Sequence, residues 1–295
     1  MNNVALTPFT MTQQLKQMHL PVEKSLVMEL AVIGTLLGLI YHPILIKLVE
    51  DWSIDPNYSH GFLIPLISGY LIWERRKTLG ETEIKPYNMG VILLLMGIFI
   101  LIVGNIASEL FTKRFSLLVV LSGIILFMMG KEFAKKLLFP LAFLIFMIPL
   151  PYILYDAIAF PLKLFASRIA TLSLLLVGIP VLREGNIIYL ANTTLEVADA
   201  CSGIRSLMSL MALGVIFAYI SQNHLWKKIT LVILTVPIAV IANAFRVTGT
   251  GFLSHYYGQE VAEGFFHTFS GWLIFIVAFV LLFASGLCLK KIGNE

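Results

Sequence analysis

The chain has 295 residues, of which 58% are apolar and only 13% are charged, and its mean hydropathy is +0.89. Soluble domains carry about 45 to 50% apolar and about 25% charged residues, so an ordinary soluble domain is excluded. The formal net charge of +4 is small and unevenly spread, which informs membrane orientation and argues against nucleic-acid binding. Only two cysteines are present, and no close Cys/His set predicts a metal site. We therefore expect one bilayer-embedded domain without a metal or organic cofactor.

Apolar runs along the chain predict its membrane crossings. A spanning helix needs roughly 20 mostly apolar residues. The polar segment 1–25 is expected in the cytoplasm, and the long run after it lacks the cleavage site of a signal peptide. The predicted fold is an all-α integral membrane protein, a single polytopic domain over residues 1–295. Its eight predicted spans are 26–48, 61–74, 89–107, 115–130, 137–150, 203–221, 229–248 and 266–287.

The stretch from Tyr152 to Gly178 decides the topology, because it is long enough for a ninth span. Arg168 near its middle would cost about 2.5 to 3.5 kcal/mol at the bilayer centre. Pro161 within the stretch, with Pro149 and Pro151 just before it, breaks the run further. Polar residues along one helical stripe are typical of a helix in the membrane interface. We therefore predict an interfacial amphipathic helix that does not cross. The stripe consists of Asp156, Lys163, Ser167 and Thr171.

The distribution of basic residues predicts the orientation. Eight spans place 13 of the 21 Lys and Arg residues on one side of the membrane. Lys and Arg are enriched in cytoplasmic segments, so this side is expected to be the cytoplasm, with both termini on it. If Tyr152–Gly178 crossed, Lys227 and Lys228 would move outside and the bias would weaken.

Residues 152–202 are expected to form an interfacial helix and then a small extracytoplasmic β-hairpin, which is followed by Cys201. Two β-rich runs flank Ala191-Asn192-Thr193, a plausible hairpin turn. Cys201 would then lie at a helix N-terminus, where the helix dipole and Arg205 lower a thiol pKa. A single cysteine is more often a small buried hydrophobe. Cys288, in an apolar run on the opposite side, is expected to be a packing residue.

Two further polar residues fall at the same predicted depth. Arg246 is near the outer end of the seventh predicted span, where an arginine marks a site or an ion pair, or extends to the interface. His267 is at the start of the last span, where a structural histidine is the common alternative. Three separate segments thus bring Cys201, Arg246 and His267 to one membrane surface.

These residues resemble the exosortases, membrane-embedded cysteine transpeptidases of Gram-negative bacteria that are related to the archaeosortases. The resemblance runs from about residue 50 to 275, and the order and spacing of its motifs are specific. It rests on Ala200-Cys-Ser-Gly-Ile-Arg205, Asn243-Ala-Phe-Arg246-Val and His267 ahead of Gly271-Trp272. Supporting motifs are Tyr58-Ser-His-Gly-Phe62, Ile179-Pro-Val-Leu-Arg-Glu-Gly185 and Leu195-Glu-Val-Ala198.

The resemblance implies a cysteine peptidase or transpeptidase of the bacterial inner membrane, with its active site facing the periplasm. Such an enzyme removes the C-terminal sorting tail of exported proteins, and the family is often linked to exopolysaccharide production. The implied partners are exported proteins with a Pro-Glu-Pro motif, a membrane span and a basic cluster, together with membrane lipids and no nucleic acid. Cys201 would form an acyl thioester, with Arg246 and His267 as its two partners.

Physical chemistry divides the roles further. Arginine stays protonated, so Arg246 suits a carbonyl oxygen that becomes anionic, whereas His267 can take and give a proton near neutral pH. A substrate carboxylate could pair with Arg205, Arg183 or Arg168, and we rank Arg205 first for its proximity to Cys201. Further candidates around the site are His60, Asn243, Asp199 and Glu196, although the last two are equally well explained as solvated hairpin carboxylates.

Three alternatives remain open on the sequence. A polytopic transporter or flippase would use Arg246 and His267 to line a path and would tolerate substitution of Cys201, but the chain shows no internal repeat. The second alternative is a rhomboid-type serine protease, but this chain lacks the G-x-S-G motif of such enzymes. A non-catalytic subunit of a polysaccharide export complex is the third. The acceptor of the acyl group is also open among water, an amine, a lipid and a sugar.

Overall fold

The computed structural model describes residues 20–191, 193–197, 203–258 and 265–292, and their side chains except those of residues 20–27 and 265–268. The chain divides into two compact units, residues 1–48 and residues 49–295. The first unit contains most of helix α2 (Leu20–Ile54). Its large apolar side chains are exposed along the helix, as expected of a helix surrounded by lipid. They include Met28, Val32, Leu36, Leu39 and Ile40.

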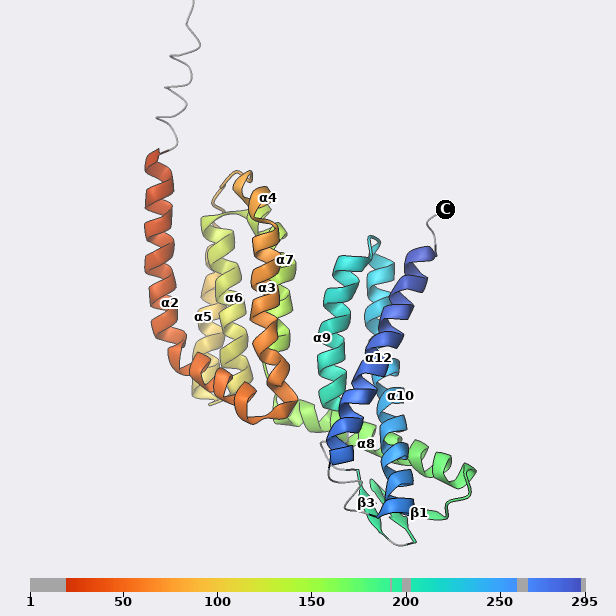
Figure 1. Cartoon of the computed structure of the whole chain (residues 1–295). Helices are drawn as coiled ribbons and strands as arrows, with labels where there is room; N and C mark the ends of the chain where they lie inside the picture. Colours follow the sequence, from red (N-terminus) through yellow and green to blue (C-terminus); the bar gives the residue numbers. More distant parts are fainter. Residues whose placement is uncertain (1–19, 192, 198–202, 259–264, 293–295) are drawn as a thin grey trace, which may run out of the picture. The chain divides into compact units, whose positions relative to one another are not determined.

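The second unit is a group of helices with one small antiparallel sheet (Figure 1). Its helices and strands are η1 (Pro56–Phe62), α3 (Leu63–Glu74), α4 (Arg76–Gly80), α5 (Gly90–Ile106), α6 (Leu110–Met128), α7 (Lys131–Phe143), η2 (Leu144–Met147), α8 (Tyr152–Leu176), β1 (Val181–Glu184), β2 (Ile187–Leu190), β3 (Thr194–Glu196), α9 (Ile204–Ser221), α10 (Leu225–Tyr257) and α12 (Phe265–Lys291).

Each of the eight predicted spans coincides with a helix, but the count of eight spans is not confirmed. By length and composition, six helices among the described residues could cross a membrane: α2, α6, α8, α9, α10 and α12. The predicted spans at α3 and α7 are helices of only 12 and 13 residues, and α5 has 17. A straight helix of 12 residues reaches about 18 Å, which is shorter than the hydrocarbon core.

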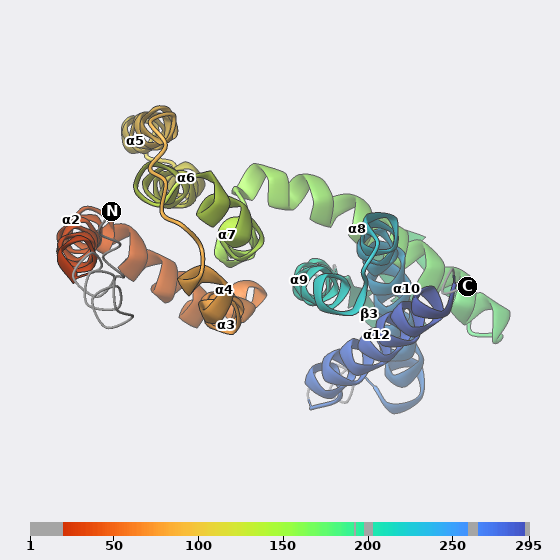
Figure 2. The same cartoon turned by 90° about the horizontal axis from the view of Figure 1, so that it is seen from above.

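Helix α8 lies crosswise to α9 and α10 in the two perpendicular views (Figure 1, Figure 2). It qualifies as a span by length and composition, so the expectation that it does not cross the membrane stays a prediction. Its predicted polar stripe needs correction, because Ser167 is buried and its hydroxyl donates a 3.0 Å hydrogen bond to the carbonyl oxygen of Gly185. This part of the stripe faces the sheet, and large apolar side chains such as Ile153 and Phe165 are exposed instead.

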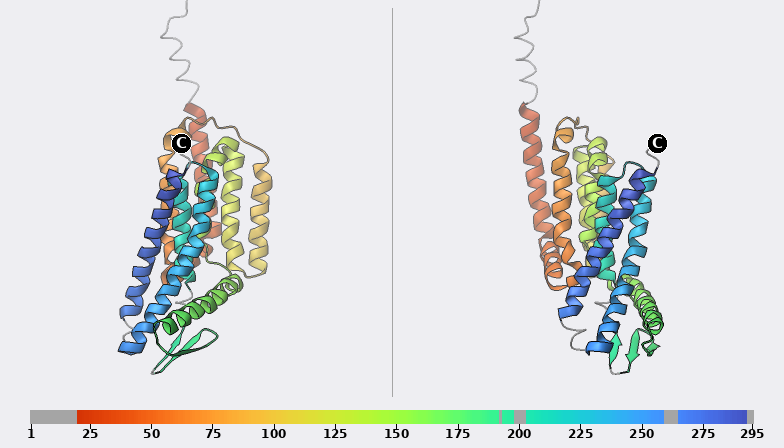
Figure 3. Two further views of the ribbon diagram at one scale, coloured as in Figure 1. Left: turned by 90° about the vertical axis from the view of Figure 1, so that its right-hand side faces the viewer. Right: turned by 45° about the vertical axis from the view of Figure 1, so that its right-hand side comes forward.

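The sheet has three strands in the order β1-β2-β3, where the sequence predicted one hairpin. The predicted turn at 191–193 lies between β2 and β3, but an additional turn at Gly185 and Asn186 divides the first β-rich run. Gly185 has a φ of +62° there, which favours glycine. Figure 3 shows the strands beside α8 and the C-terminal end of α10. Their shared core contains Ala170, Leu174, Ile179, Ile188, Leu195, Val197 and Val247.

Helices α9, α10 and α12 form a second core, which positions the candidate site. Small residues let these helices approach closely, as is common in membrane proteins. A methyl group on Gly214 of α9 would lie 2.2 Å from a methyl carbon of Thr235 on α10, and one on Gly286 of α12 would lie 2.4 Å from the ring of Phe217 on α9. Apolar residues of all three helices fill the core: Leu207, Leu210, Leu231, Ala239, Ala242, Ala278 and Leu282.

Candidate functional site

The start of α9 is fixed against α10 by a close glycine contact. Gly203 caps α9 in the left-handed region, with a φ of +82°. A Cβ atom at this position would lie 2.7 Å from the side-chain Cγ of Asn243, so only glycine fits here without a shift. The predicted residues Cys201 and Asp199 lie outside the described residues. The described chain therefore resumes two residues after Cys201, directly against the buried Asn243.

The chain that leads toward Cys201 is also anchored on α10. Val197 is 1% exposed and belongs to the same core as Val247, which is adjacent in sequence to Arg246. Two hydrogen bonds join it to Asn186 at the first turn: the Val197 amide donates to the Asn186 carbonyl at 2.9 Å, and the Asn186 side-chain amide donates to the Val197 carbonyl at 3.2 Å. The last described residue before Cys201 is thus fixed beside the segment that carries Arg246.

Arg246 is half-buried and its guanidinium lies against α12. A Cβ atom built on Gly271 would be 3.3 Å from Nη2 and 3.4 Å from Cζ of Arg246. Gly271 follows His267 by four residues, and positions four apart share one face of a helix. The side chain of His267 lies outside the described ones, although its backbone is in the first turn of α12.

The sequence placed Arg246 near the end of a span, whereas α10 continues for three further turns to Tyr257. Arg246 therefore lies within a helix, where its backbone is held on both sides. The residues after it that were predicted as a polar outer loop, from Ser254 onward, are helical as far as Tyr257. Cys288 was expected to be a packing residue, but its side chain is exposed on α12, because this part of the helix presents apolar residues outward.

Arg205 and His60 both lie where α9 contacts η1. The Nε of Arg205 donates a 3.1 Å hydrogen bond to Oδ1 of Asn57, and Ser209, one turn further along α9, is 3.4 Å from Nδ1 of His60. Burial lowers the pKa of His60, although hydrogen bonds with the backbone of Phe146 and Asn57 act in the opposite direction. His60 is therefore held as a neutral imidazole in the folded protein around neutral pH.

The motif Tyr58-Ser-His-Gly-Phe62 forms η1 because of local caps and a close ring contact. The carboxylate of Asp55 accepts a 2.8 Å hydrogen bond from the Asn57 amide at the start of η1. Trp52 donates its indole N–H to the Met147 carbonyl at 2.8 Å, and its ring fills the space where a Gly61 side chain would be, with only 2.3 Å to a built Cβ. This packing holds His60 and Asn57 toward α9.

The other predicted residues take simpler places. Arg183 donates to the Gly185 carbonyl at 2.7 Å and so stabilises the first turn of the sheet. Arg168 on α8 and Glu196 on β3 are exposed, which for Glu196 agrees with a solvated carboxylate. Of the three arginines considered for a substrate carboxylate, only Arg205 is joined to another element of the candidate site by a hydrogen bond in the described part of the chain.

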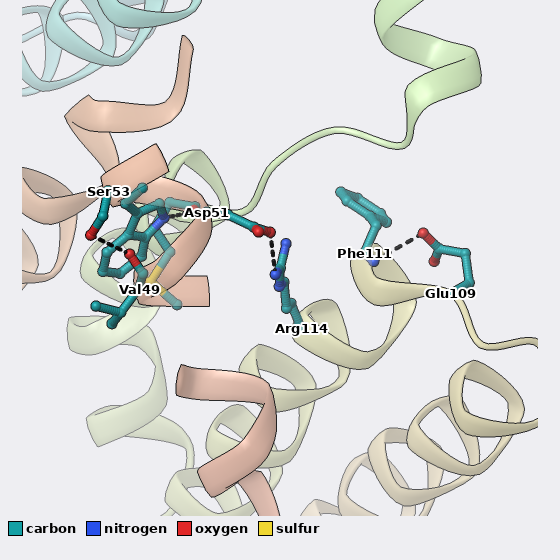
Figure 4. A network of polar contacts seen from close by, with 8 residues as sticks. Val49, Asp51, Ser53, Glu109, Phe111 and Arg114 are labelled. Atoms are coloured by element: carbon teal, nitrogen blue, oxygen red, sulfur yellow. Dashed lines mark hydrogen bonds and ion pairs between the residues drawn. The ribbon is translucent and has the colours of Figure 1, made fainter. Parts of the chain in front are cut away.

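A cavity of about 500 Å³ lies next to this contact. Arg114, 2% exposed, pairs with Asp51 at 2.5 Å (Figure 4). Glu109 caps α6 by accepting hydrogen bonds from the Phe111 and Thr112 amides at 2.9 and 2.5 Å. Burial and the nearby carboxylate of Asp55 raise the pKa of Tyr58 to about 12. The polar and aromatic lining comprises Asp51, Asp55, Asn57, Tyr58, Ser108, Glu109, Phe111, Arg114, Tyr152 and Tyr155.

Sequence reasoning did not name Asn57, Gly203, Ser209 and Gly271 as site residues, although Gly203 and Gly271 belong to the motifs quoted above. Two of them follow a predicted residue by one helical turn, since Ser209 follows Arg205 and Gly271 follows His267, and this spacing could have identified them. Among the described residues, no three His, Cys, Asp or Glu side chains are grouped to hold a metal ion. The expectation that no cofactor is needed stays a prediction.

Comparison with known protein families gives a match over most of the chain. The model of the transmembrane exosortases (Exosortase_EpsH) matches residues 52–284, which is most of the chain. Neither the comparison with curated proteins nor that with solved structures gave a match. The matched range contains η1, the sheet, α9, α10 and the part of α12 that carries Gly271. Together with the membrane-type helices, this match identifies a multi-pass membrane protein that belongs to the transmembrane exosortase family.

Proposed function

We propose that the chain is a membrane cysteine transpeptidase or protease that removes the C-terminal sorting tail of exported proteins through an acyl thioester on Cys201. Membership of the exosortase family supports a membrane transpeptidase role. The observation that carries the proposal is a pair of glycine contacts: Gly203 against Asn243, and Gly271 against Arg246. They join α9, α10 and α12 within one turn of Asn243 and Arg246.

Covalent geometry limits how far Cys201 can be from this junction. An extended chain spans at most about 3.6 Å per residue, so two residues from Gly203 reach about 7 Å. The anchor at Val197 restricts the chain from the other side. For His267, one helical turn before Gly271 corresponds to about 6 Å along the same face of α12. These limits support a site in which the thiol and the imidazole both approach the Arg246 guanidinium.

The proposed reaction begins when the Cys201 thiolate attacks the scissile carbonyl carbon. The Arg246 guanidinium stabilises the oxygen that becomes anionic, because it is permanently charged and presents several donors. His267 takes the thiol proton and returns it to the leaving amine of the sorting tail. The upstream part of the substrate then remains on sulfur as a thioester. Attack of an acceptor on the thioester carbonyl completes the reaction and restores the thiol.

Arg205 is our proposed partner for the glutamate of a Pro-Glu-Pro substrate. Its Nε is engaged by Asn57, which orients the guanidinium plane. Within the part of the chain that the structure describes, its two terminal nitrogens make no hydrogen bond, and a carboxylate can accept from two such donors at once. Arg183 is engaged at its own turn, so it is the weaker candidate.

We further propose that the site faces the periplasm from the inner membrane and that both termini are cytoplasmic, with the interfacial α8 beside it. The exposed apolar side chains of α8 would insert into the membrane surface while its buried side holds the sheet. These side chains include Tyr152, Ile153, Leu154, Phe160 and Phe165. The link to exopolysaccharide production rests on the family resemblance.

The test follows a reporter protein that ends in a Pro-Glu-Pro motif, a membrane span and a basic cluster. Cells that express the wild-type chain should shorten the reporter, whereas Cys201→Ala should leave it intact and Cys201→Ser should process it far more slowly. Cys288→Ala is the matched control, because it removes an exposed thiol outside the candidate site, and it should process normally. Undiminished processing by both Cys201 variants would contradict the proposal and favour a transporter or a structural subunit.

A further inference from the structure

The cavity beside η1 has no role in the cleavage chemistry, and its composition indicates a ligand. Its volume of about 500 Å³ is within the range of small-molecule sites in proteins. Its walls come from four places in the second unit: the end of α2 with η1, the turn before α6, the first turn of α6, and the start of α8. Such a convergence of separate segments is typical of a binding site.

Charge determines which ligands suit the cavity. Three carboxylates, from Asp51, Asp55 and Glu109, surround it, against the single guanidinium of Arg114. Burial opposes ionisation of Glu109, but hydrogen bonds from Thr112 and Phe111 and the charge of Arg114 keep its pKa below the usual value. The cavity therefore carries an excess of negative charge. It repels the carboxylate of a Pro-Glu-Pro motif and favours a cation.

The aromatic residues support the same choice. Tyr58, Tyr152, Tyr155 and Phe111 line the cavity, and the face of an aromatic ring attracts an ammonium group. The guanidinium of Arg114 is 2% exposed and pairs with Asp51, so little of its charge faces the cavity.

The cavity also adjoins the proposed catalytic segment. Asn57 lines it and accepts the hydrogen bond from Arg205, which is four residues after Cys201. A ligand in the cavity is thus separated from the start of α9 by one side-chain pair.

We propose that this cavity binds the acceptor of the transfer reaction, a primary amine. This inference rests on the proposed function of Cys201. Before transfer, the ammonium group is held among the carboxylates and tyrosine rings, and it must leave them to reach the thioester. In the transfer step the amine nitrogen forms a bond to the thioester carbonyl carbon and the carbon–sulfur bond breaks. Of the two protons that the ammonium nitrogen loses, one goes to sulfur and the other to solvent.

The first experiment measures binding without turnover. Glycinamide is titrated into full-length Cys201→Ala protein in detergent and followed by saturation-transfer NMR, with N-acetylglycinamide as the ligand that lacks an ammonium group. We expect glycinamide to bind and its acetylated form to bind much more weakly. Asp55→Asn should weaken glycinamide binding about fivefold, the effect of one partly screened charge, while asparagine still caps η1.

Glu184→Gln is the matched control, because it removes one exposed carboxylate on β1, outside the cavity. Equal binding of the two ligands, or equal affinity of the Asp55→Asn and Glu184→Gln proteins, would overturn the proposal. If Asp55→Asn lost its helical circular dichroism, Tyr152→Leu would replace it. This variant changes an exposed ring and should weaken binding about threefold; unchanged binding would again overturn the site.

The second experiment separates this proposal from the function of Cys201. Wild-type protein processes the tailed reporter in the presence of glycinamide, and mass spectrometry distinguishes the amide product from the hydrolysed one. The proposal predicts an amide product whose yield falls in Asp55→Asn but not in Glu184→Gln. Tail release with only hydrolysed product at saturating glycinamide would overturn the acceptor site and leave the cleavage function intact. If no tail were released, the proposed function would fail, and the binding experiment alone would decide whether the cavity is a ligand site.

Discussion

The α5–α6 pair and the α9–α10–α12 group both depend on glycines, but these glycines contact different partners. In the first, Gly90 lies against the backbone of Phe127 and Gly123 against the backbone nitrogen of Leu94, so two helices approach almost directly. In the second, Gly203 and Gly271 lie against the polar side chains of Asn243 and Arg246. Glycine therefore provides helix packing in both regions, since Gly214 and Gly286 let α9, α10 and α12 approach, and at Gly203 and Gly271 it also leaves space for polar groups of the candidate site.

Among substitutions of these glycines, the largest effect is expected at Gly203. Gly203→Ala would place a Cβ 2.7 Å from the Asn243 side chain and add strain at a φ of +82°. The start of α9 must shift, and a misplacement of about 1 Å can cost about 100-fold in rate. We expect reporter processing to fall about 100-fold at unchanged expression.

Gly249→Ala is its control, because this glycine of α10 has open space around it. The Gly249→Ala protein should process the reporter normally. Wild-type rates in Gly203→Ala would show that catalysis does not depend on the position of the start of α9. This result would contradict the functional role given to the Gly203 contact.

In the α5–α6 pair, the same kind of substitution should affect stability instead. A Cβ at Gly123 would lie 2.6 Å from the backbone nitrogen of Leu94, which no side-chain rotation can relieve. Overpacking of this kind costs about 1 to 3 kcal/mol. Gly123→Ala should unfold at lower temperature in detergent, while the folded fraction keeps its normal rate per molecule.

Gly69→Ala serves as the stability control, since nothing lies near this glycine of α3. Alanine should leave stability unchanged or raise it slightly, by up to about 1 kcal/mol. A Gly123→Ala protein as stable as the wild type would mean that the close approach of α5 and α6 is not required.

A smaller effect is expected at Gly271. A Cβ there would lie 3.3 Å from Nη2 of Arg246, and the flexible guanidinium can retreat by a few tenths of an ångström. Gly271→Ala should therefore lower kcat about threefold to tenfold, with KM unchanged, because Arg246 is proposed to act on the transition state. Steady-state cleavage of a tailed peptide in detergent measures both constants. A change confined to KM would place Arg246 in substrate binding.

The smallest expected effect concerns pH, and it distinguishes the two regions again. The glycine contacts of α5 and α6 contain no group that titrates near pH 6, whereas His60 beside α9 has a pKa lowered by burial. The unfolded chain therefore binds a proton more readily than the folded one, so stability is complete above about pH 6.5, the unperturbed value, and falls as the pH decreases below it. His60→Asn should flatten this dependence. Parallel unfolding temperatures of both proteins from pH 7.5 to 5.5 would contradict it.

The sequence predicted the positions of the helices better than their packing. Apolar runs located all eight helices assigned as spans, but the predicted polar stripe of α8 was partly wrong, because Ser167 is buried against the sheet. The extra turn at Gly185 was missed because the runs on both sides of it are equally β-rich. The lengths of α3 and α7 depend on caps and breaks that hydropathy does not record.

The candidate site was predictable by residue type but not by contact. Arg205 and His60 were named from motifs, yet their partners Asn57 and Ser209 follow from the docking of η1 on α9, which is a tertiary event. Similarly, no local pattern shows that Gly271 adjoins the Arg246 guanidinium. Single-sequence patterns report periodicity and propensity, whereas such contacts depend on how distant helices pack.

The most direct test of the central claim is the detection of the acyl intermediate on Cys201. Full-length protein is mixed with the tailed reporter, quenched in acid, digested and analysed by mass spectrometry, with hydroxylamine to cleave a thioester. We predict that the peptide containing Cys201 carries the upstream fragment of the reporter, that hydroxylamine removes it, and that the peptide containing Cys288 stays unmodified. Tail release at the normal rate without any adduct on Cys201 under these conditions, or an adduct on Cys288 instead, would contradict the account.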